Sequence, residues 1–227
     1  MTTLYHFWSS HEARRVWLAL HCKGVSFDDR PLSYDDDDTF FELGVARAVP
    51  LLELDEGTRL GDAWDILWRV DELFPQAPAL RAEIVDADAW QALRTWRERA
   101  EPILARLYAP LAPAYHDVAG HETTLAAYKA EVERRFGMGV EALANDRYAG
   151  YEQLARLSRL PELARHLARN GYYLGTLSIA DLVLTADLHP LQLLDGVSLP
   201  IELMYYFKRV ERACGADLGA GLASRGG

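Results

Sequence analysis

Residues 48–60 read Ala48-Val49-Pro50-Leu51-Leu52-Glu53-Leu54-Asp55-Glu56-Gly57-Thr58-Arg59-Leu60. The apolar run at Leu51–Leu54 predicts a buried strand. Pro50 is compatible with this prediction, because proline is tolerated at the first residue of a strand or on an edge strand. The turn signal at Asp55–Gly57 predicts a second, antiparallel strand, and the pattern from Ala63 to Leu73 predicts a helix. The stretch therefore predicts a β-β-α unit.

The chain before this stretch predicts a β-α-β unit. Its apolar pattern changes period repeatedly and predicts strands at Leu4–Phe7 and Ser26–Leu32, with a helix at Glu12–Lys23 between them. Such a unit has a right-handed crossover and a buried parallel pair of strands. Residues 1–75 are thus expected to form one α/β domain.

The remainder of the chain predicts helices only. A proline pair at Pro75 and Pro78 marks a linker over residues 76–83, and residues 84–227 form the expected all-helical domain. The first long helix is expected to bend at Pro102, and a second runs from Leu125 to Phe136. The small residues from Gly215 onward are expected to fray. The fold class is α/β followed by all-α.

Composition excludes several kinds of partner. The 227 residues carry 24 Lys and Arg against 34 Asp and Glu, a net charge of −10, and the basic residues are interspersed with acids. This predicts no nucleic-acid partner and no anionic membrane surface. No apolar window is long enough for a membrane span, and the first residues lack a secretory signal, so a cytoplasmic location is expected.

The cysteines and the acidic run predict no metal. Cys22 and Cys214 lie far apart without a C-x-x-C motif, as expected for two reduced packing thiols. Asp35–Asp38 lacks the alternating ligands of a chelating loop. We expect a solvated loop that caps the next short helix.

Two serines lie where the first strand meets the first helix. Ser9 and Ser10 are followed by His11, so their hydroxyls and the free N–H groups of the helix are expected to face an anion together. A hydroxyl that donates to a thiolate there would lower the thiol pKa by about one to two units. The alternative is an ordinary serine N-cap. No G-x-S-x-G motif supports a serine hydrolase.

Three further motifs each have a structural and a functional interpretation. Val49 before Pro50 could pair with an extended peptide if the bond were cis, although trans is the default from sequence. Asp62 with Ala63 opens the third helix, either as a cap or as a site for an ammonium and a carboxylate. Ser178 with Asp181 predicts a capping box with a structural role.

Together these marks resemble the cytosolic glutathione S-transferase family over almost the whole chain. The residues that carry the resemblance are Leu4-Tyr5, Ser10, Arg15-Val16-x-Leu18-Ala19-Leu20, Lys23-Gly24, Val49-Pro50-x-Leu52 and Ser178-Ile179-Ala180-Asp181. The resemblance is to a serine-type, bacterial-like member. It implies a thioredoxin-like N-terminal domain that binds glutathione and a helical C-terminal domain that supplies an electrophile pocket.

The resemblance also assigns roles by position. Ser10 matches the activating serine, with Ser9 as the alternative, and Val49 before a cis Pro50 matches the residue that pairs with the cysteinyl unit. Asp62-Ala63 matches the acid-serine pair that holds the γ-glutamyl group, and Arg47 is the candidate for the glycyl carboxylate. The residues expected to line the electrophile pocket are Trp8, Tyr108 and Tyr115.

The chain departs from the family pattern at Ala63, Ala48 and His6. Ala63 lacks the serine hydroxyl, and losing a hydrogen bond to a charged group costs about 1.5–3 kcal/mol. Ala48 stands where a basic side chain often precedes Val-Pro, and His6 falls near the tyrosine of the tyrosine-type classes.

The function implied is a homodimeric enzyme of detoxification that conjugates glutathione to a hydrophobic electrophile without a metal. The alternative is a protein of the same fold that binds a ligand or partner with weak or no conjugating activity.

Overall fold

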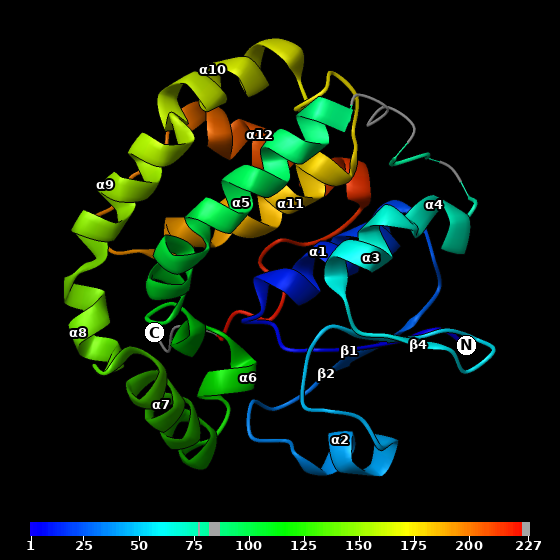
Figure 1. Cartoon of the computed structure of the whole chain (residues 1–227), viewed down its shortest axis with the longest axis vertical. Helices are drawn as coiled ribbons and strands as arrows, with labels where there is room; N and C mark the ends of the chain where they lie inside the picture. Colours follow the sequence, from blue (N-terminus) through cyan, green and yellow to red (C-terminus); the bar gives the residue numbers. More distant parts are fainter. Residues whose placement is uncertain (77, 82–86, 224–227) are drawn as a thin grey trace.

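A computed structural model describes residues 1–76, 78–81 and 87–223 (Figure 1). Its only sheet within these ranges has the strand order β2-β1-β3-β4. The strands are β1 (Thr3–His6), β2 (Asp28–Pro31), β3 (Leu51–Glu53) and β4 (Arg59–Leu60). β1 runs parallel to β2 and antiparallel to β3, which pairs antiparallel with β4. This is the β-α-β and β-β-α order that the sequence predicts.

Four helices belong to this N-terminal part. They are α1 (His11–Cys22), α2 (Asp38–Leu43), α3 (Ala63–Trp68) and α4 (Val70–Leu73). The single helix expected from Ala63 to Leu73 is wrong, because the chain leaves helical geometry at Arg69, with φ −98° and ψ 6°. α1 packs on α3 along one side and on the C-terminal helix α11 along the other.

The C-terminal part consists of helices. They are α5 (Ala87–Tyr108), α6 (His116–Ala119), α7 (Glu122–Phe136), α8 (Val140–Asn145), α9 (Arg147–Ser158), α10 (Leu160–Asn170), α11 (Ile179–Leu188) and α12 (Ile201–Cys214), with 3-10 turns η2 (Ala112–Ala114) and η3 (His189–Leu193). α5 continues through Pro102 as one helix. Figure 1 shows α11 inside this part, with α5 and α12 beside it.

The predicted linker falls partly outside the description. Residues 77, 82 and 83 of the stretch 76–83 are among the residues that the structure does not describe. The domain boundaries at 75 and 84 therefore stay predictions.

A capping box starts α11, whose residues are all buried. The Asp181 carboxylate accepts hydrogen bonds from the Ser178 amide at 2.9 Å, from the Ser178 hydroxyl at 2.9 Å and from the Tyr173 amide at 2.8 Å. The Tyr206 hydroxyl of α12 donates to the same carboxylate at 2.9 Å. Burial raises the pKa of Asp181, and these four donors oppose that effect. Asp181 thus connects the start of α11 to the preceding loop and to α12.

A second buried carboxylate joins the two parts of the chain. Asp187 of α11 accepts from Arg15 of α1 at 2.8 Å and forms an ion pair with Arg97 of α5 at 2.9 Å. The side chains of Asp187 and Arg15 are fully buried, and that of Arg97 is 5% exposed. The three charges therefore interact with little screening by water.

The C-terminal segment is ordered against the core, contrary to the expected fraying. Leu218 is 2% exposed, and its carbonyl accepts from Arg14 at 2.9 Å. Leu222 forms an isolated β-bridge with Tyr115, and a Cβ at Gly221 would stand 2.1 Å from the Trp8 ring. The small residues let the backbone lie directly on Trp8, a tertiary contact that composition does not reveal. Residues 224–227 lie outside the description.

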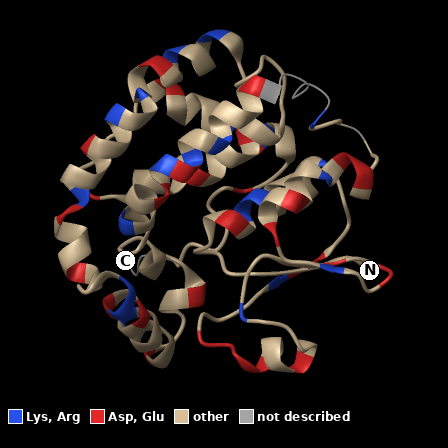
Figure 2. Ribbon diagram, in the orientation of Figure 1, with Lys and Arg blue, Asp and Glu red and all other residues tan. Residues whose placement is uncertain are grey.

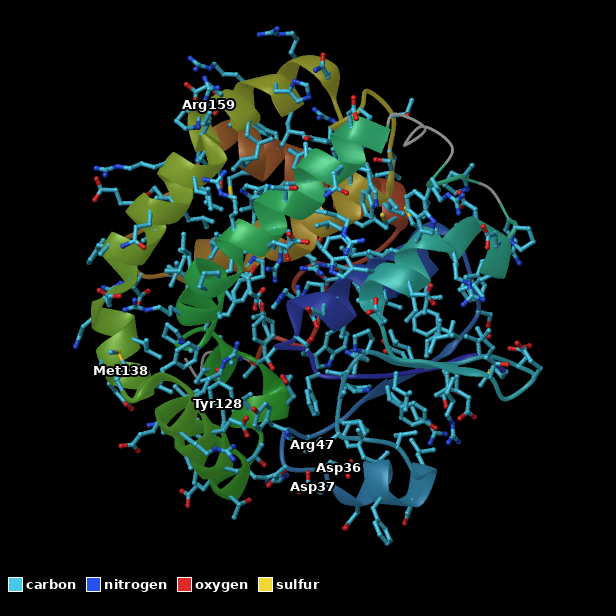
Figure 3. All side chains as sticks on the ribbon, viewed as in Figure 1. Asp36, Asp37, Arg47, Tyr128, Met138 and Arg159 are labelled. Carbon is cyan, nitrogen blue, oxygen red and sulfur yellow. The ribbon has the colours of Figure 1, made fainter. Side chains whose placement is uncertain are left out.

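The acidic loop and the cysteines take the places that the sequence predicts. Asp37 is the N-cap residue of α2 but makes no side-chain cap hydrogen bond, and the preceding Asp36 accepts from the Thr39 amide at 2.9 Å. Figure 3 shows Asp36 and Asp37 beside Arg47. Cys22 and Cys214 are free, buried thiols whose sulfur atoms lie 2.8 Å apart.

The distribution of charged residues and the apolarity of the helices can be compared with the composition. Figure 2 shows acidic and basic residues interspersed along the helices. None of the helices within the described ranges combines the length and apolarity that crossing a membrane requires.

We predict that Asp187→Asn lowers the free energy of unfolding by about 3–5 kcal/mol, because two buried guanidinium groups lose their counterion. Urea denaturation measures the change. Glu152→Gln is the matched control, since Glu152 pairs with Arg156 where both side chains are exposed, at 65% and 77%. A loss for Asp187→Asn as small as the control's would contradict the prediction.

We predict that Asp181→Ala costs about 2–4 kcal/mol of unfolding free energy, because four donors lose their shared acceptor. Urea denaturation with the same control measures it. A loss below about 1 kcal/mol would show that the surrounding groups find other partners.

Candidate functional site

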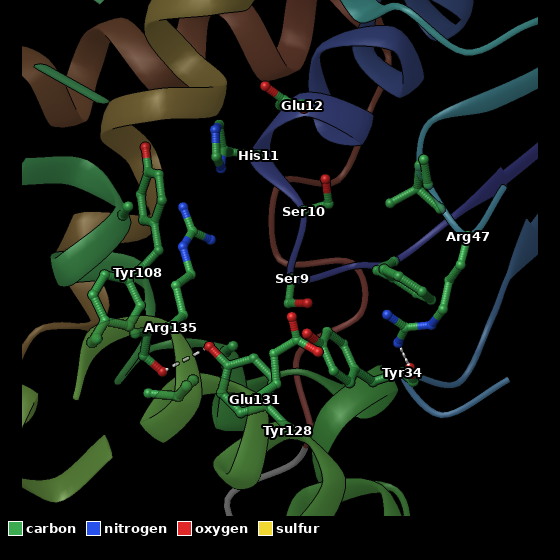
Figure 4. A pocket seen from close by; sticks show the side chains of 18 of the residues that line it. Ser9, Ser10, His11, Glu12, Tyr34, Arg47, Tyr108, Tyr128, Glu131 and Arg135 are labelled. Atoms are coloured by element: carbon green, nitrogen blue, oxygen red, sulfur yellow. Dashed lines mark hydrogen bonds between the residues drawn. The ribbon is translucent and has the colours of Figure 1, made fainter. Parts of the chain in front are cut away.

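A cavity of about 280 Å³ lies between the two parts of the chain. Its walls come from the loop between β1 and α1, the segment before β3, and helices α5 and α7. Figure 4 shows Ser9, Ser10 and His11 on one side of this cavity, facing Tyr128, Glu131 and Arg135 of α7. Clefts between domains are the usual location of small-molecule sites.

The two adjacent serines have different hydrogen bonds. Ser10 is the N-cap of α1, and its Oγ accepts from the Ala13 amide at 3.2 Å. The Ser9 hydroxyl donates to Asp117 at 2.5 Å, and the Ser9 amide donates to the same oxygen at 3.1 Å. Within the described ranges, the Ser10 hydroxyl proton has no acceptor. Ser10 therefore has a proton to donate into the cavity, whereas Ser9 has given its proton to Asp117.

His11, the first residue of α1, is held neutral. Its pKa lies well below the ordinary value, first because of burial and then because Arg15, Arg97 and Arg135 repel a positive charge. An N–H of Arg97 points to His11 Nε2 at 2.5 Å, which fixes this nitrogen as an acceptor. His11 is thus no free base for Ser10.

Tyr108 forms the inner wall beside His11. Their rings lie 4.6 Å apart, and the Tyr108 hydroxyl donates to the Asp187 carbonyl at 2.6 Å. Burial raises the pKa of Tyr108 well above its ordinary value, and the negative charge of Asp187 adds to the effect. The tyrosine therefore stays protonated and presents its ring to the cavity.

The segment before β3 forms the opposite wall. Arg47, Ala48 and Val49 line the cavity, and the Val49–Pro50 peptide bond is cis, unlike the trans default of sequence alone. Within the described part of the chain, no hydrogen bond engages the Val49 amide or carbonyl. Arg47 forms an ion pair with Asp37 at 2.8 Å.

The remaining predicted residues lie away from this cavity. Asp62 is exposed, caps α3 by accepting from the Asp65 amide at 2.8 Å, and does not line the cavity. Ala63 is 5% exposed and packs in the core. A Cβ at Gly61 would stand 3.8 Å from the Pro50 carbonyl oxygen, so this helix start is adjacent to the cis proline.

Of the three residues predicted for the electrophile pocket, only Tyr108 lines the cavity. Trp8 packs on Trp17 and under Gly221, and Tyr115 is bridged to Leu222. The C-terminal segment covers the Trp8 ring, and Tyr115 is only 3% exposed.

Sequence reasoning missed the contribution of α7. Tyr128, Glu131, Val132 and Arg135 all line the cavity and follow the i, i+3, i+4, i+7 spacing of one helix face. The sequence predicted the helix from Leu125 to Phe136 but not that one of its faces lines a site. The charged residues Glu131 and Arg135 interrupt an otherwise apolar helix face, and this interruption was the signal that could have indicated a site.

No metal site is apparent in the parts of the chain that the structure describes: no group of three or more His, Cys, Asp or Glu side chains is placed to hold an ion.

Comparison with known proteins identifies sequences and structures similar to this chain. Residues 4–78 match the family model described as glutathione S-transferase, N-terminal domain. The structure is similar to glutaredoxin 2 from Salmonella typhimurium in complex with glutathione, with a TM-score of 0.78, 18% identity and 96% of each chain covered. The sequence has no significant match among curated proteins.

Two glutathione S-transferase structures are similar over nearly the full chain. The protein from Rhodospirillum rubrum has a TM-score of 0.66 at 20% identity and covers 99% of this chain and 94% of its own. The rice protein in complex with glutathione has a TM-score of 0.61 at 20% identity and covers 99% of this chain and 92% of its own.

The fold is therefore a thioredoxin-like domain followed by a helical domain, as the sequence predicts. The family match covers residues 4–78, which are therefore similar to the N-terminal domain of glutathione S-transferases.

Proposed function

We propose that this protein binds glutathione in the cavity beside Ser10 and conjugates its sulfur to an electrophile, as a serine-type transferase. The observation that carries the proposal is the free hydroxyl proton of Ser10 at the N-terminus of α1, within a cavity between the domains. Several similar structures are complexes with glutathione, which supports this ligand.

Ser10 acts on the sulfur by donating a hydrogen bond. A thiolate accepts this bond more strongly than a thiol does, and the helix N-terminus adds a positive potential. A thiol pKa lowered by about one to two units favours the nucleophilic form by roughly 1.4–2.7 kcal/mol. His11 adds no positive charge, since its pKa is lowered.

Three further positions complete the proposal. The free backbone groups of Val49 are suited to pair with the cysteinyl unit of glutathione, Arg47 with the glycyl carboxylate, and Asp62 with the γ-glutamyl ammonium. Pro50 and the Ala63 amide are assigned to the same end of glutathione as Asp62, beside the residues that line the cavity. The homodimer, the cytoplasmic location and the role in detoxification stay predictions.

No cysteine lines the cavity, since Cys22 and Cys214 lie in the core. This favours conjugation over an exchange of disulfides by the protein's own thiols.

We predict that Ser10→Ala lowers kcat/KM for glutathione with a general aryl halide by about tenfold near neutral pH. The reason is that the thiol pKa rises by about one unit when the donor is lost. The pH profile of kcat/KM measures this shift directly. A loss below about threefold, with an unmoved profile, would contradict thiolate activation by Ser10.

Ser9→Ala is the matched control. Because the Ser9 proton already goes to Asp117, we expect this variant to lose stability but to keep the pH profile of the wild type. If Ser9→Ala moved the profile and Ser10→Ala did not, Ser9 would be the activating residue. Glutathione binding by the wild type without any conjugation would favour the alternative of a binding protein.

We predict that Ala63→Ser tightens glutathione binding by about tenfold, because the hydroxyl restores a hydrogen bond to the γ-glutamyl carboxylate. Isothermal titration calorimetry measures the dissociation constant. Urea denaturation is the control, since Ala63 is buried and its added hydroxyl requires a partner. An unchanged dissociation constant in a folded variant would contradict this placement.

A further inference from the structure

The charged residues that line the cavity differ in whether they already have a partner. Glu101 forms an ion pair with Arg97, and Glu131 forms one with Arg134 at 2.8 Å. Arg47 is paired with Asp37. Most of the charge on the walls is therefore compensated inside the protein.

Arg135 of α7 is the exception. It lines the cavity, and within residues 1–76, 78–81 and 87–223 no carboxylate oxygen lies within 4.0 Å of its guanidinium nitrogens. Its described contact is with the neighbouring Phe136 ring, 5.1 Å from the guanidinium carbon. Figure 4 shows the side chain rising from α7 toward His11 and Ser9. A cation thus extends into the cavity without a counterion.

Arg135 also acts electrostatically on His11. Its charge is one of those that lower the pKa of His11, after burial and the two arginines of the ion network. A neutral His11 leaves Arg135 as the cation at this end of the cavity.

Tyrosine side chains contribute aromatic rings to the same cavity as Arg135. Tyr34, Tyr108 and Tyr128 all line the cavity. The hydroxyl of Tyr108 donates to the Asp187 carbonyl, and that of Tyr128 donates to the Ala109 carbonyl at 3.0 Å. Both hydroxyl protons are committed to the backbone, so these two residues contribute ring carbons and no hydroxyl donor to the cavity.

One acidic residue of the cavity also lacks an ion pair among the described residues. Glu12 lies in the first turn of α1. Figure 4 shows it beyond His11, at the end of the cavity away from α7. A negative group of a ligand is therefore favoured at the α7 end.

We propose that the second substrate is an aromatic electrophile that carries a carboxylate, and that Arg135 binds this carboxylate. The inference rests on the proposed transferase function and names the substrate class of the same cavity. The planar guanidinium matches a carboxylate with two parallel hydrogen bonds. Arg135 sets specificity in this scheme, while Ser10 acts on the sulfur.

The test compares 4-chloro-3,5-dinitrobenzoate with its methyl ester, which has the same ring and leaving group without the charge. In each reaction a C–S bond forms, the C–Cl bond breaks and chloride leaves. We expect Arg135→Gln to lower the acid-to-ester ratio of kcat/KM by about tenfold, since a charge-assisted hydrogen bond is lost. Dividing by the wild-type ratio cancels the different intrinsic reactivities of the two compounds.

Two variants serve as controls. Arg156→Gln removes a charge from α9 that does not line the cavity and whose ion-pair partner, Glu152, does not line it either, so we expect the ratio to stay unchanged. Arg135→Lys keeps the charge, and we expect it to restore part of the ratio. Added salt should lower the wild-type ratio and leave that of Arg135→Gln nearly constant.

The proposal is overturned if Arg135→Gln leaves the acid-to-ester ratio of kcat/KM unchanged. It is also overturned if the variant keeps this ratio and binds glutathione more weakly. That last result would assign Arg135 to a carboxylate of glutathione. If the wild type conjugates neither compound, the proposed transferase function fails. Calorimetry with the unreactive 3,5-dinitrobenzoate and its methyl ester then still tests whether Arg135 binds the carboxylate. Binding of the acid that is weakened by Arg135→Gln but not by Arg156→Gln supports it, and equal binding of acid and ester by the wild type overturns it.

Discussion

The buried ion network of Asp187, Arg15 and Arg97 is the constraint on which the relation of the two domains depends. Two guanidinium groups share one carboxylate with almost no water, so removal of Asp187 leaves buried positive charges whose desolvation is not repaid. The network joins α1 of the first domain to α5 and α11 of the second. It also shapes the cavity, because Tyr108 donates to the carbonyl of Asp187 and Arg97 donates to His11. After burial, the positive charges of Arg15 and Arg97 help to keep His11 neutral.

Sequence predicted the parts of the fold that depend on neighbouring residues. Strand and helix periods gave the order of the N-terminal elements, and the Ser178-x-x-Asp181 spacing gave a capping box whose partners lie within a few residues. The break at Arg69 and the ordered C-terminal segment were not predictable in this way. The latter depends on Trp8 and Arg14, which lie more than 200 positions from Leu218, the residue that Arg14 contacts. For the same reason the pairing of Arg15 with Asp187, separated by 172 positions, leaves no local pattern.

The same division holds for the candidate site. Ser10 and Val49 were selected from a strand-to-helix junction and a strand start, and both line the cavity. Tyr128 and Arg135 were missed, since nothing in their local sequence shows that α7 faces the first domain across the cavity. The burial of Ala63, which is 5% exposed, was also not predictable from local sequence, because it depends on how α3 packs on the core.

The net charge of −10 is compatible with anionic ligands because electrostatic effects here are local. At physiological ionic strength, exposed charges farther away than about 8 Å are largely screened. A ligand inside the cavity therefore responds mainly to the wall, where Glu101 and Glu131 are neutralised by ion pairs and Arg135 is not. Since His11 is uncharged, the sulfur at the α1 end depends on the Ser10 hydroxyl and on the helix N-terminus. The two ends of the cavity thus act separately, with thiolate stabilisation at α1 and selection of a carboxylate at α7.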